Sequence, residues 1–330
     1  MNVSSIVGAL SPARFVAPLH LVSNLPAQHS AGSHPRPGIC PLALAGGLLL
    51  VPLLSLASGV PRAKERFANL DGHRIYYRSF GSGKRAMIFV SGWGCDTSLW
   101  RNQVPALVPY SRVLLVDLPG HGRSDKPDIP YTLDLFARAV YAVLEHARVQ
   151  KAAVVGHSMG GMVAYEFARR WPEKTIALIW VDGTFTIPVD VDQQITGLRK
   201  RAEDFRSPDY QEKVRKFIDQ LYVPQTPAAV RDEVARSILA TPQHVLAGCM
   251  DGLADRRLFE PHTLDIPAFA IFSSFWNPER FIAIFKKSLP RFQYEVLTGV
   301  GHYPMLEKPD LVNAALTRFV ASIQPELRKQ

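Results

Sequence analysis

Acidic residues are missing from the beginning of this 330-residue chain. Residues 1–60 contain no Asp or Glu and only two basic side chains, Arg14 and Arg36, so all 29 acidic residues lie in residues 61–330. Basic blocks with interleaved aromatic side chains are also lacking, although the formal net charge is +9. Without such a block the excess charge indicates a solvated surface, and we expect no nucleic-acid partner.

Cysteine is scarce as well. Three cysteines, Cys40, Cys95 and Cys249, exclude a disulfide scaffold. For Cys95 and Cys249 we favour two buried thiols over a single disulfide. No group of His, Cys and acidic residues has the spacing of a metal site, and the glycines match neither the dinucleotide-binding nor the phosphate-binding pattern. We therefore expect no cofactor and no metal.

The acid-free leader contains an uncharged apolar run at residues 39–57. This run is just long enough to cross a bilayer, but its prolines and a glycine pair weaken it as a helix. Arg36 before it and the small residues Ala57, Ser58 and Gly59 after it are typical of a secretory signal. We predict export, to the periplasm or outside the cell. The alternatives are an uncleaved membrane anchor and an organelle transit peptide.

Short apolar runs alternate with segments of helical period after the leader. Asp71 and Gly72 between the runs 66–70 and 74–80 predict a β-hairpin. The later runs are apolar at consecutive positions, which predicts strands buried on both faces in a mostly parallel, doubly wound α/β sheet. The expected strands are 86–90, 112–117, 152–156, 177–182, 268–272 and 293–297, and the expected helices are 131–149, 158–171 and 313–323.

Residues 183–264 interrupt this alternation. They contain no convincing strand, and their apolar spacing predicts amphipathic helices at 193–206, 209–222, 228–239 and 244–254. We expect a helical cap inserted into the core formed by residues 61–182 and 265–330, because the strand pattern resumes after it. A separate, unrelated domain is the alternative.

The strongest motif is Gly156-His157-Ser158-Met159-Gly160, between an expected strand and an expected helix. A sharp strand-to-helix turn holds the central serine in a strained conformation, so the residues two positions on either side must lack a side chain. The Ser158 hydroxyl would then lie at a helix N-terminus, where negative charge is stabilised. This context predicts a nucleophilic serine.

With this motif, residues 66–323 resemble the α/β-hydrolase family. Residues 116–124 are similar to the family's loop after its fourth strand, residues 91–94 to its oxyanion loop, and Gly301-His302 to its catalytic-histidine loop. The resemblance implies a nucleophile at Ser158, a base at His302, and an oxyanion hole formed by the amides of Trp93 and Met159.

The acid partner of the histidine is harder to assign. Asn277 stands after the expected strand 268–272, where the family usually has Asp, and Glu279 follows two residues later. Asp182 ends the strand 177–182, at the edge where some family members place their acid. We favour Asp182, with Asn277 or Glu279 as alternatives, and the absence of a functioning acid as a further one.

Together these residues predict a serine hydrolase that cleaves a small carboxylic ester through an acyl-enzyme on Ser158. Trp93, Leu99, Met159 and Phe185 are expected to line a sizeable, partly apolar pocket. One alternative is an acyltransferase or haloperoxidase-like enzyme with the same triad. Another is a non-catalytic, ligand-binding relative, an alternative that the Asn at position 277 suggests. No protein partner is predicted, and membrane association would be limited to the leader.

Overall fold

The computed structural model of the chain describes residues 62–185, 190–260 and 262–328. The predicted leader, with its apolar run 39–57 and Cys40, lies outside these residues. Within the described ranges, no helix has the length and apolar character needed to cross a membrane.

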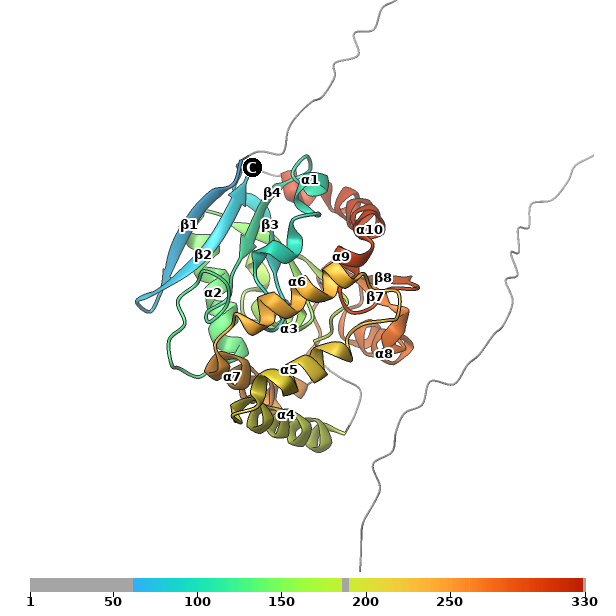
Figure 1. Cartoon of the computed structure of the whole chain (residues 1–330). Helices are drawn as coiled ribbons and strands as arrows, with labels where there is room; N and C mark the ends of the chain where they lie inside the picture. Colours follow the sequence, from blue (N-terminus) through green and yellow to red (C-terminus); the bar gives the residue numbers. More distant parts are fainter. Residues whose placement is uncertain (1–61, 186–189, 261, 329–330) are drawn as a thin grey trace, which may run out of the picture. The chain divides into compact units, whose positions relative to one another are not determined.

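An eight-stranded sheet forms the centre of the fold, in the order β1-β2-β4-β3-β5-β6-β7-β8 (Figure 1). Strands β3 to β8 run parallel, while β1 and β2 are antiparallel to their neighbours. The predicted doubly wound, mostly parallel α/β sheet is therefore confirmed. The bounds are β1 Lys64–Leu70, β2 His73–Phe80, β3 Arg85–Val90, β4 Arg112–Val116, β5 Lys151–His157, β6 Thr175–Val181, β7 Ala268–Ser273 and β8 Phe292–Leu297.

The hairpin between β1 and β2 follows from its turn residues. Asp71 and Gly72 have φ angles of 52° and 88°. A two-residue turn that matches the twist of the strands needs positive φ at both positions, which Asp tolerates and Gly adopts freely. The predicted hairpin is present at these residues.

Helices cover both faces of the sheet. Along β7, Phe269 stacks on Phe319 of α10, whereas Phe272 packs edge-on against Phe285 of α8. Because odd and even positions of a strand point to opposite faces, α8 and α10 lie on opposite sides. The helices of the core are α1 Val104–Leu107, α2 Leu133–His146, α3 Met159–Arg170, α8 Glu279–Ser288, α9 Pro304–Glu307, α10 Pro309–Ser322 and α11 Gln324–Arg328, with short 3-10 helices η1 Thr97–Trp100, η2 Pro172–Lys174 and η4 Ser274–Trp276.

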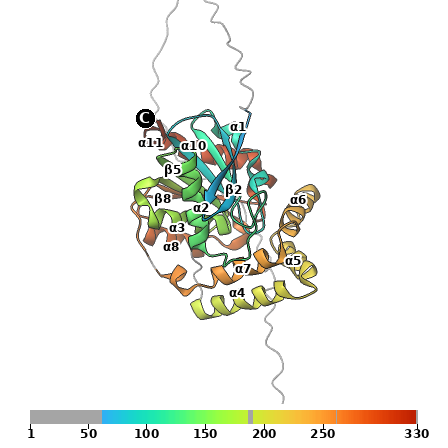
Figure 2. The ribbon, with the colours of Figure 1, turned by 90° about the vertical axis from the view of Figure 1, so that its left-hand side faces the viewer.

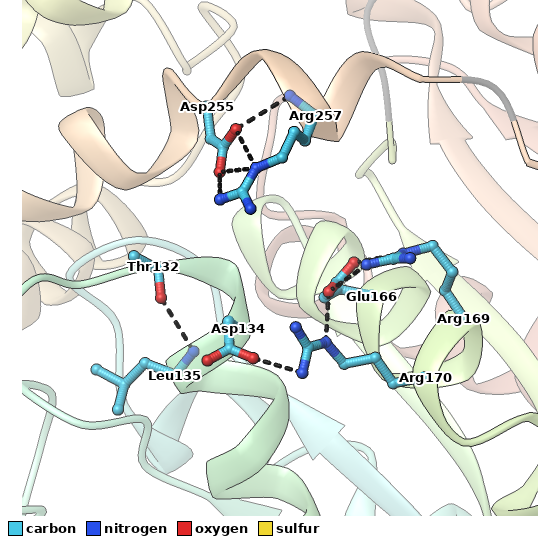
Figure 3. Close-up of polar contacts among 8 residues, drawn as sticks. All are labelled: Thr132, Asp134, Leu135, Glu166, Arg169, Arg170, Asp255 and Arg257. Carbon is cyan, nitrogen blue, oxygen red and sulfur yellow. Dashed lines mark hydrogen bonds and ion pairs between the residues drawn. The ribbon is translucent and has the colours of Figure 1, made fainter.

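A group of charged residues ties α3 to α2 (Figure 3). The buried carboxylate of Glu166 accepts hydrogen bonds from Arg169 and Arg170, and Arg170 also pairs with Asp134 on α2 at 2.5 Å. Thr132 caps the N-terminus of α2 through a bond from the Leu135 amide. These contacts fix the helix that begins immediately after Ser158.

Four helices lie between β6 and β7 in the described chain: α4 Val191–Arg206, α5 Tyr210–Asp219, α6 Ala228–Leu239 and α7 Gln243–Leu253, followed by the 3-10 helix η3 Arg256–Phe259. They gather on one side of the sheet, with α4 and α7 side by side (Figures 1 and 2). Each coincides with a predicted helix to within a few residues. We call residues 190–260 the cap.

Candidate active site

The chain turns sharply at Ser158, between β5 and α3. Ser158 has φ 52° and ψ −122°, a conformation that is costly for a residue with a side chain. A Cβ atom on Gly156 would lie 2.2 Å from the Gly160 carbonyl oxygen, and one on Gly160 would lie 2.3 Å from the Val90 carbonyl oxygen. Both glycines are therefore required for the steric reason predicted from the motif.

The His302 ring is held by Asp182. Its Nδ1 lies 2.7 Å from Asp182 Oδ2, although the two residues are 120 positions apart in the sequence. Asp182 is 3% exposed, and its carboxylate also accepts hydrogen bonds from the Ser273 amide and from the Trp276 indole N–H. Asp182 itself has φ 47°, so a strained backbone presents this carboxylate just as it presents Ser158.

The charge state of Asp182 follows from these partners. Burial is the largest single effect and by itself would raise the pKa of this carboxyl group. The hydrogen bond and positive charge offered by His302, together with the hydrogen bonds from Ser273, outweigh burial and hold the pKa below its usual value of 3.8. Asp182 is thus an ionised hydrogen-bond acceptor that orients the His302 ring.

The two alternative acids lie elsewhere. Asn277 ends the 3-10 helix η4 at φ 52°, and Glu279 begins α8; both are exposed. Among the contacts between described residues, neither forms a hydrogen bond or an ion pair with His302. Of the three residues considered, only Asp182 meets the histidine.

Trp93, in the loop that the sequence predicts to form the oxyanion hole, is fixed against the cap. Its indole Nε1 donates to the Leu246 carbonyl at 3.0 Å, and its ring stacks on Phe205 at 5.1 Å. Met159 is the first residue of α3, where an amide N–H has no partner within its own helix. Outside helices and strands, the backbone hydrogen bonds between described residues use neither the Trp93 nor the Met159 amide as a donor.

The histidine loop is braced from two sides. His157 Nε2 lies 2.8 Å from the His302 carbonyl oxygen, and burial is the main reason that the pKa of His157 falls to about 3, so this ring is neutral and donates. The Glu307 carboxylate accepts from the amides of Gly301 and Tyr303 and from the Thr226 hydroxyl of the cap. His302 therefore has a fixed main chain as well as a fixed ring.

Ser158, His302 and Asp182 line one cavity of about 420 Å³ between the carboxyl ends of the strands and the cap. Trp93 and Met159 line it as predicted, whereas Leu99 and Phe185 do not; those two predictions were wrong, because both side chains are buried in the core instead. The remaining lining is largely apolar and includes Met162, Leu198, Phe217, Leu221, Met250, Leu253, Phe272, Trp276 and Phe281. A larger hollow near Tyr131 and His244 contains neither Ser158 nor His302.

Three residues at this site escaped the sequence reasoning. Trp276 and Glu307 act through hydrogen bonds to Asp182 and to the histidine loop, for which the sequence carries no periodic signal. Arg201 also lines the cavity. A signal for it did exist, because Arg201 interrupts an apolar stripe of α4 between Leu198 and Phe205.

Cys95 and Cys249 are both buried and unpaired, in line with the favoured interpretation. No group of three or more His, Cys, Asp or Glu side chains within the described ranges could hold a metal ion.

A serine on a strained strand-to-helix turn lines one cavity with a histidine that is oriented by a buried carboxylate, and helices of the cap cover this cavity. This arrangement is that of a hydrolase site. The chain matches the Alpha/beta hydrolase family over residues 87–315 and belongs to that family. It is an alpha/beta hydrolase enzyme with esterase homologues, as the resemblance implied.

Known proteins similar to the chain include esterases. The pimeloyl-[acyl-carrier protein] methyl ester esterase of Edwardsiella ictaluri is 28% identical over 254 residues, covering 74% of this chain and 96% of that protein. A thermophilic esterase from Thermogutta terrifontis has a TM-score of 0.70 at 23% identity, covering 80% of this chain and 99% of that one. The enol-lactonase of Burkholderia xenovorans has a TM-score of 0.68 at 21% identity, covering 78% and 100%.

Proposed function

We propose that the protein hydrolyses a carboxylic ester through an acyl-enzyme formed on Ser158. The observation that carries this proposal is the pairing of His302 with the buried carboxylate of Asp182 at 2.7 Å, in the cavity that Ser158 also lines. A histidine oriented in this way can take the proton of a neighbouring serine hydroxyl near neutral pH. The names of the esterase relatives support the same class of reaction.

In the first half-reaction, Ser158 Oγ attacks the ester carbonyl carbon and its proton passes to His302 Nε2. Asp182 accepts the hydrogen bond from His302 Nδ1 and stabilises the imidazolium that forms. The amides of Trp93 and Met159 donate to the oxygen that becomes negative. When the tetrahedral intermediate collapses, the carbon–oxygen bond to the alcohol breaks, and His302 gives its proton to the departing alcohol.

In the second half-reaction, water replaces the alcohol. His302 removes a proton from the water as its oxygen attacks the acyl carbon, and the same two amides receive the developing charge. Collapse of this intermediate breaks the bond to Ser158 Oγ and returns the proton to it, which releases the carboxylic acid. No group other than the residues named is required for either step.

A fluorophosphonate probe tests the nucleophile. We expect wild-type protein to be labelled on Ser158 and Ser158→Ala to remain unlabelled, while Ser98→Ala, which removes an exposed hydroxyl on η1, is labelled like the wild type. His302→Ala should label far more slowly, because the serine loses its base. Labelling of the wild type no faster than Ser158→Ala would refute the proposal.

A further inference from the structure

One cation lies among the apolar side chains of the active-site cavity. Arg201, on the cap helix α4, is half-buried and lines the cavity together with Ser158 and His302. Its helical neighbours on the same face, Leu198 and Phe205, are apolar. Guanidinium groups are seldom kept in such surroundings without a partner, because removing the charge from water is costly.

Arg201 has no carboxylate partner among the residues that the structure describes. All 29 acidic residues of the chain lie in the described ranges, and among them none is within ion-pair distance of Arg201. Asp204 acts on it only through its more distant charge, and that carboxylate is shared with Lys200 at 3.7 Å and Lys213 at 3.6 Å. The other carboxylate at the cavity, Asp182, is bound to His302.

A ring covers one face of the guanidinium and leaves its edge available. The Arg201 Cζ atom lies 4.6 Å from the centre of the Phe217 ring. No hydrogen bond between the described residues has Arg201 as its donor, so the five N–H groups in the plane of the guanidinium lack protein acceptors. An oxygen-rich anion would satisfy them in pairs.

The position of Arg201 also suits a substrate whose ester bond lies at Ser158. The Phe217 ring that supports Arg201 packs edge-on against the Trp93 ring, 5.5 Å between centres. Trp93 belongs to the loop that carries one of the two proposed oxyanion donors. One cation–ring contact and one contact between rings therefore connect Arg201 to the place where the ester carbonyl would lie. A short chain of methylene groups can bridge this span inside an apolar cavity.

We propose that Arg201 binds a carboxylate on the substrate, so that the enzyme prefers esters that carry a negative charge on the acyl or the alcohol part. This proposal rests on the ester hydrolysis proposed above. In the free enzyme the guanidinium is kept in place by the Phe217 ring, and in the complex the substrate supplies the charge that the protein does not.

Matched pairs of p-nitrophenyl esters test the preference. One member of each pair has an acyl chain ending in a carboxylate and the other the same chain ending in a neutral carboxamide, over a series of chain lengths. A second series of esters carries the carboxylate or the carboxamide on the alcohol part. The variants are Arg201→Gln, Arg201→Lys, and Arg199→Gln, which removes an exposed arginine of the same helix as a matched control.

The wild type should show a kcat/KM about 10- to 100-fold higher for the carboxylate than for the carboxamide in at least one series, as expected for a charge-assisted hydrogen-bonded pair. Arg201→Gln should abolish that ratio through a loss on the carboxylate substrate, with turnover of the carboxamide retained. Arg201→Lys should keep part of the preference, and Arg199→Gln all of it.

Two results would overturn the proposal, and they lead to different conclusions about ester hydrolysis. If the wild type hydrolyses both members of each pair equally well, or if Arg201→Gln keeps the preference, the anion site is wrong and ester hydrolysis stands. If no ester of either series is hydrolysed, the proposed function fails and the anion site falls with it.

Discussion

Asp182→Asn is the substitution that examines the site most closely. Asn tolerates the positive φ of 47° at this position and has nearly the shape of Asp, so the backbone should not change. If the amide oxygen keeps the hydrogen bond from the Ser273 amide, the amide nitrogen faces two donors, Trp276 Nε1 and His302 Nδ1. His302 can then accept at Nδ1 only by placing its proton on Nε2.

That tautomer cannot take a proton from Ser158. We expect kcat to fall by about 10⁴-fold, which corresponds to about 5 kcal/mol of activation free energy. The remaining clash of donors with Trp276 should lower the free energy of unfolding by about 1–3 kcal/mol. Hydrolysis of a p-nitrophenyl ester and urea unfolding measure the two effects separately.

Asn277→Ala and Glu279→Gln serve as controls, because both residues are exposed and neither contacts His302. Both should retain wild-type turnover. Near-normal kcat in a folded Asp182→Asn protein would refute the role of Asp182 as the acid partner of His302. A large loss of kcat in either control would assign the acid to that position instead.

Two further predictions concern the architecture that holds the site. Gly156→Ala should lower the free energy of unfolding by at least about 1–3 kcal/mol in urea titrations, because the new Cβ meets the Gly160 carbonyl oxygen at 2.2 Å. Gly197→Ala, in the open on helix α4, should instead add about 0.5–1 kcal/mol, and equal effects would contradict the steric account. Asp117 accepts bonds from the Thr97 and Arg123 amides, yet burial raises its pKa to about 6. The carboxyl group of Asp117 thus holds a proton more tightly in the folded protein than in the unfolded chain. The free energy of unfolding of the wild type, relative to that of Asp117→Asn, should therefore fall by up to about 3 kcal/mol as the pH rises from about 4 to about 6. Parallel curves of unfolding free energy against pH for the two proteins would show that the pKa is not raised.

The fold was predictable from local patterns. The apolar runs that became β3 to β7 are buried on both faces, and the spacing of apolar residues in the cap determined where its four helices lie. Helix α8 was not predicted. Strand β8 is more exposed than expected because it lies at the edge of the sheet.

The site was predictable where a motif fixes the geometry. The glycines around Ser158 predict a sharp turn with no room for a Cβ at either glycine, and a histidine after the last strand lies at the same edge of the sheet. The acid required tertiary information, because Asp182, Asn277 and Glu279 all follow strands at that edge and the sequence does not show which of the three side chains reaches His302. The sequence could not show that Arg201 lacks a carboxylate partner, because this depends on how α4 packs against the core.

The central claim is a covalent acyl group on Ser158. Mass spectrometry of the protein quenched during turnover of a p-nitrophenyl ester tests it most directly. We expect one added acyl mass per chain, located on the peptide that contains Ser158, and no added mass in Ser158→Ala. Two results would contradict an acyl-enzyme on Ser158. One is steady hydrolysis in which neither the wild type nor Asp182→Asn accumulates an acyl adduct. The other is an adduct that persists in Ser158→Ala.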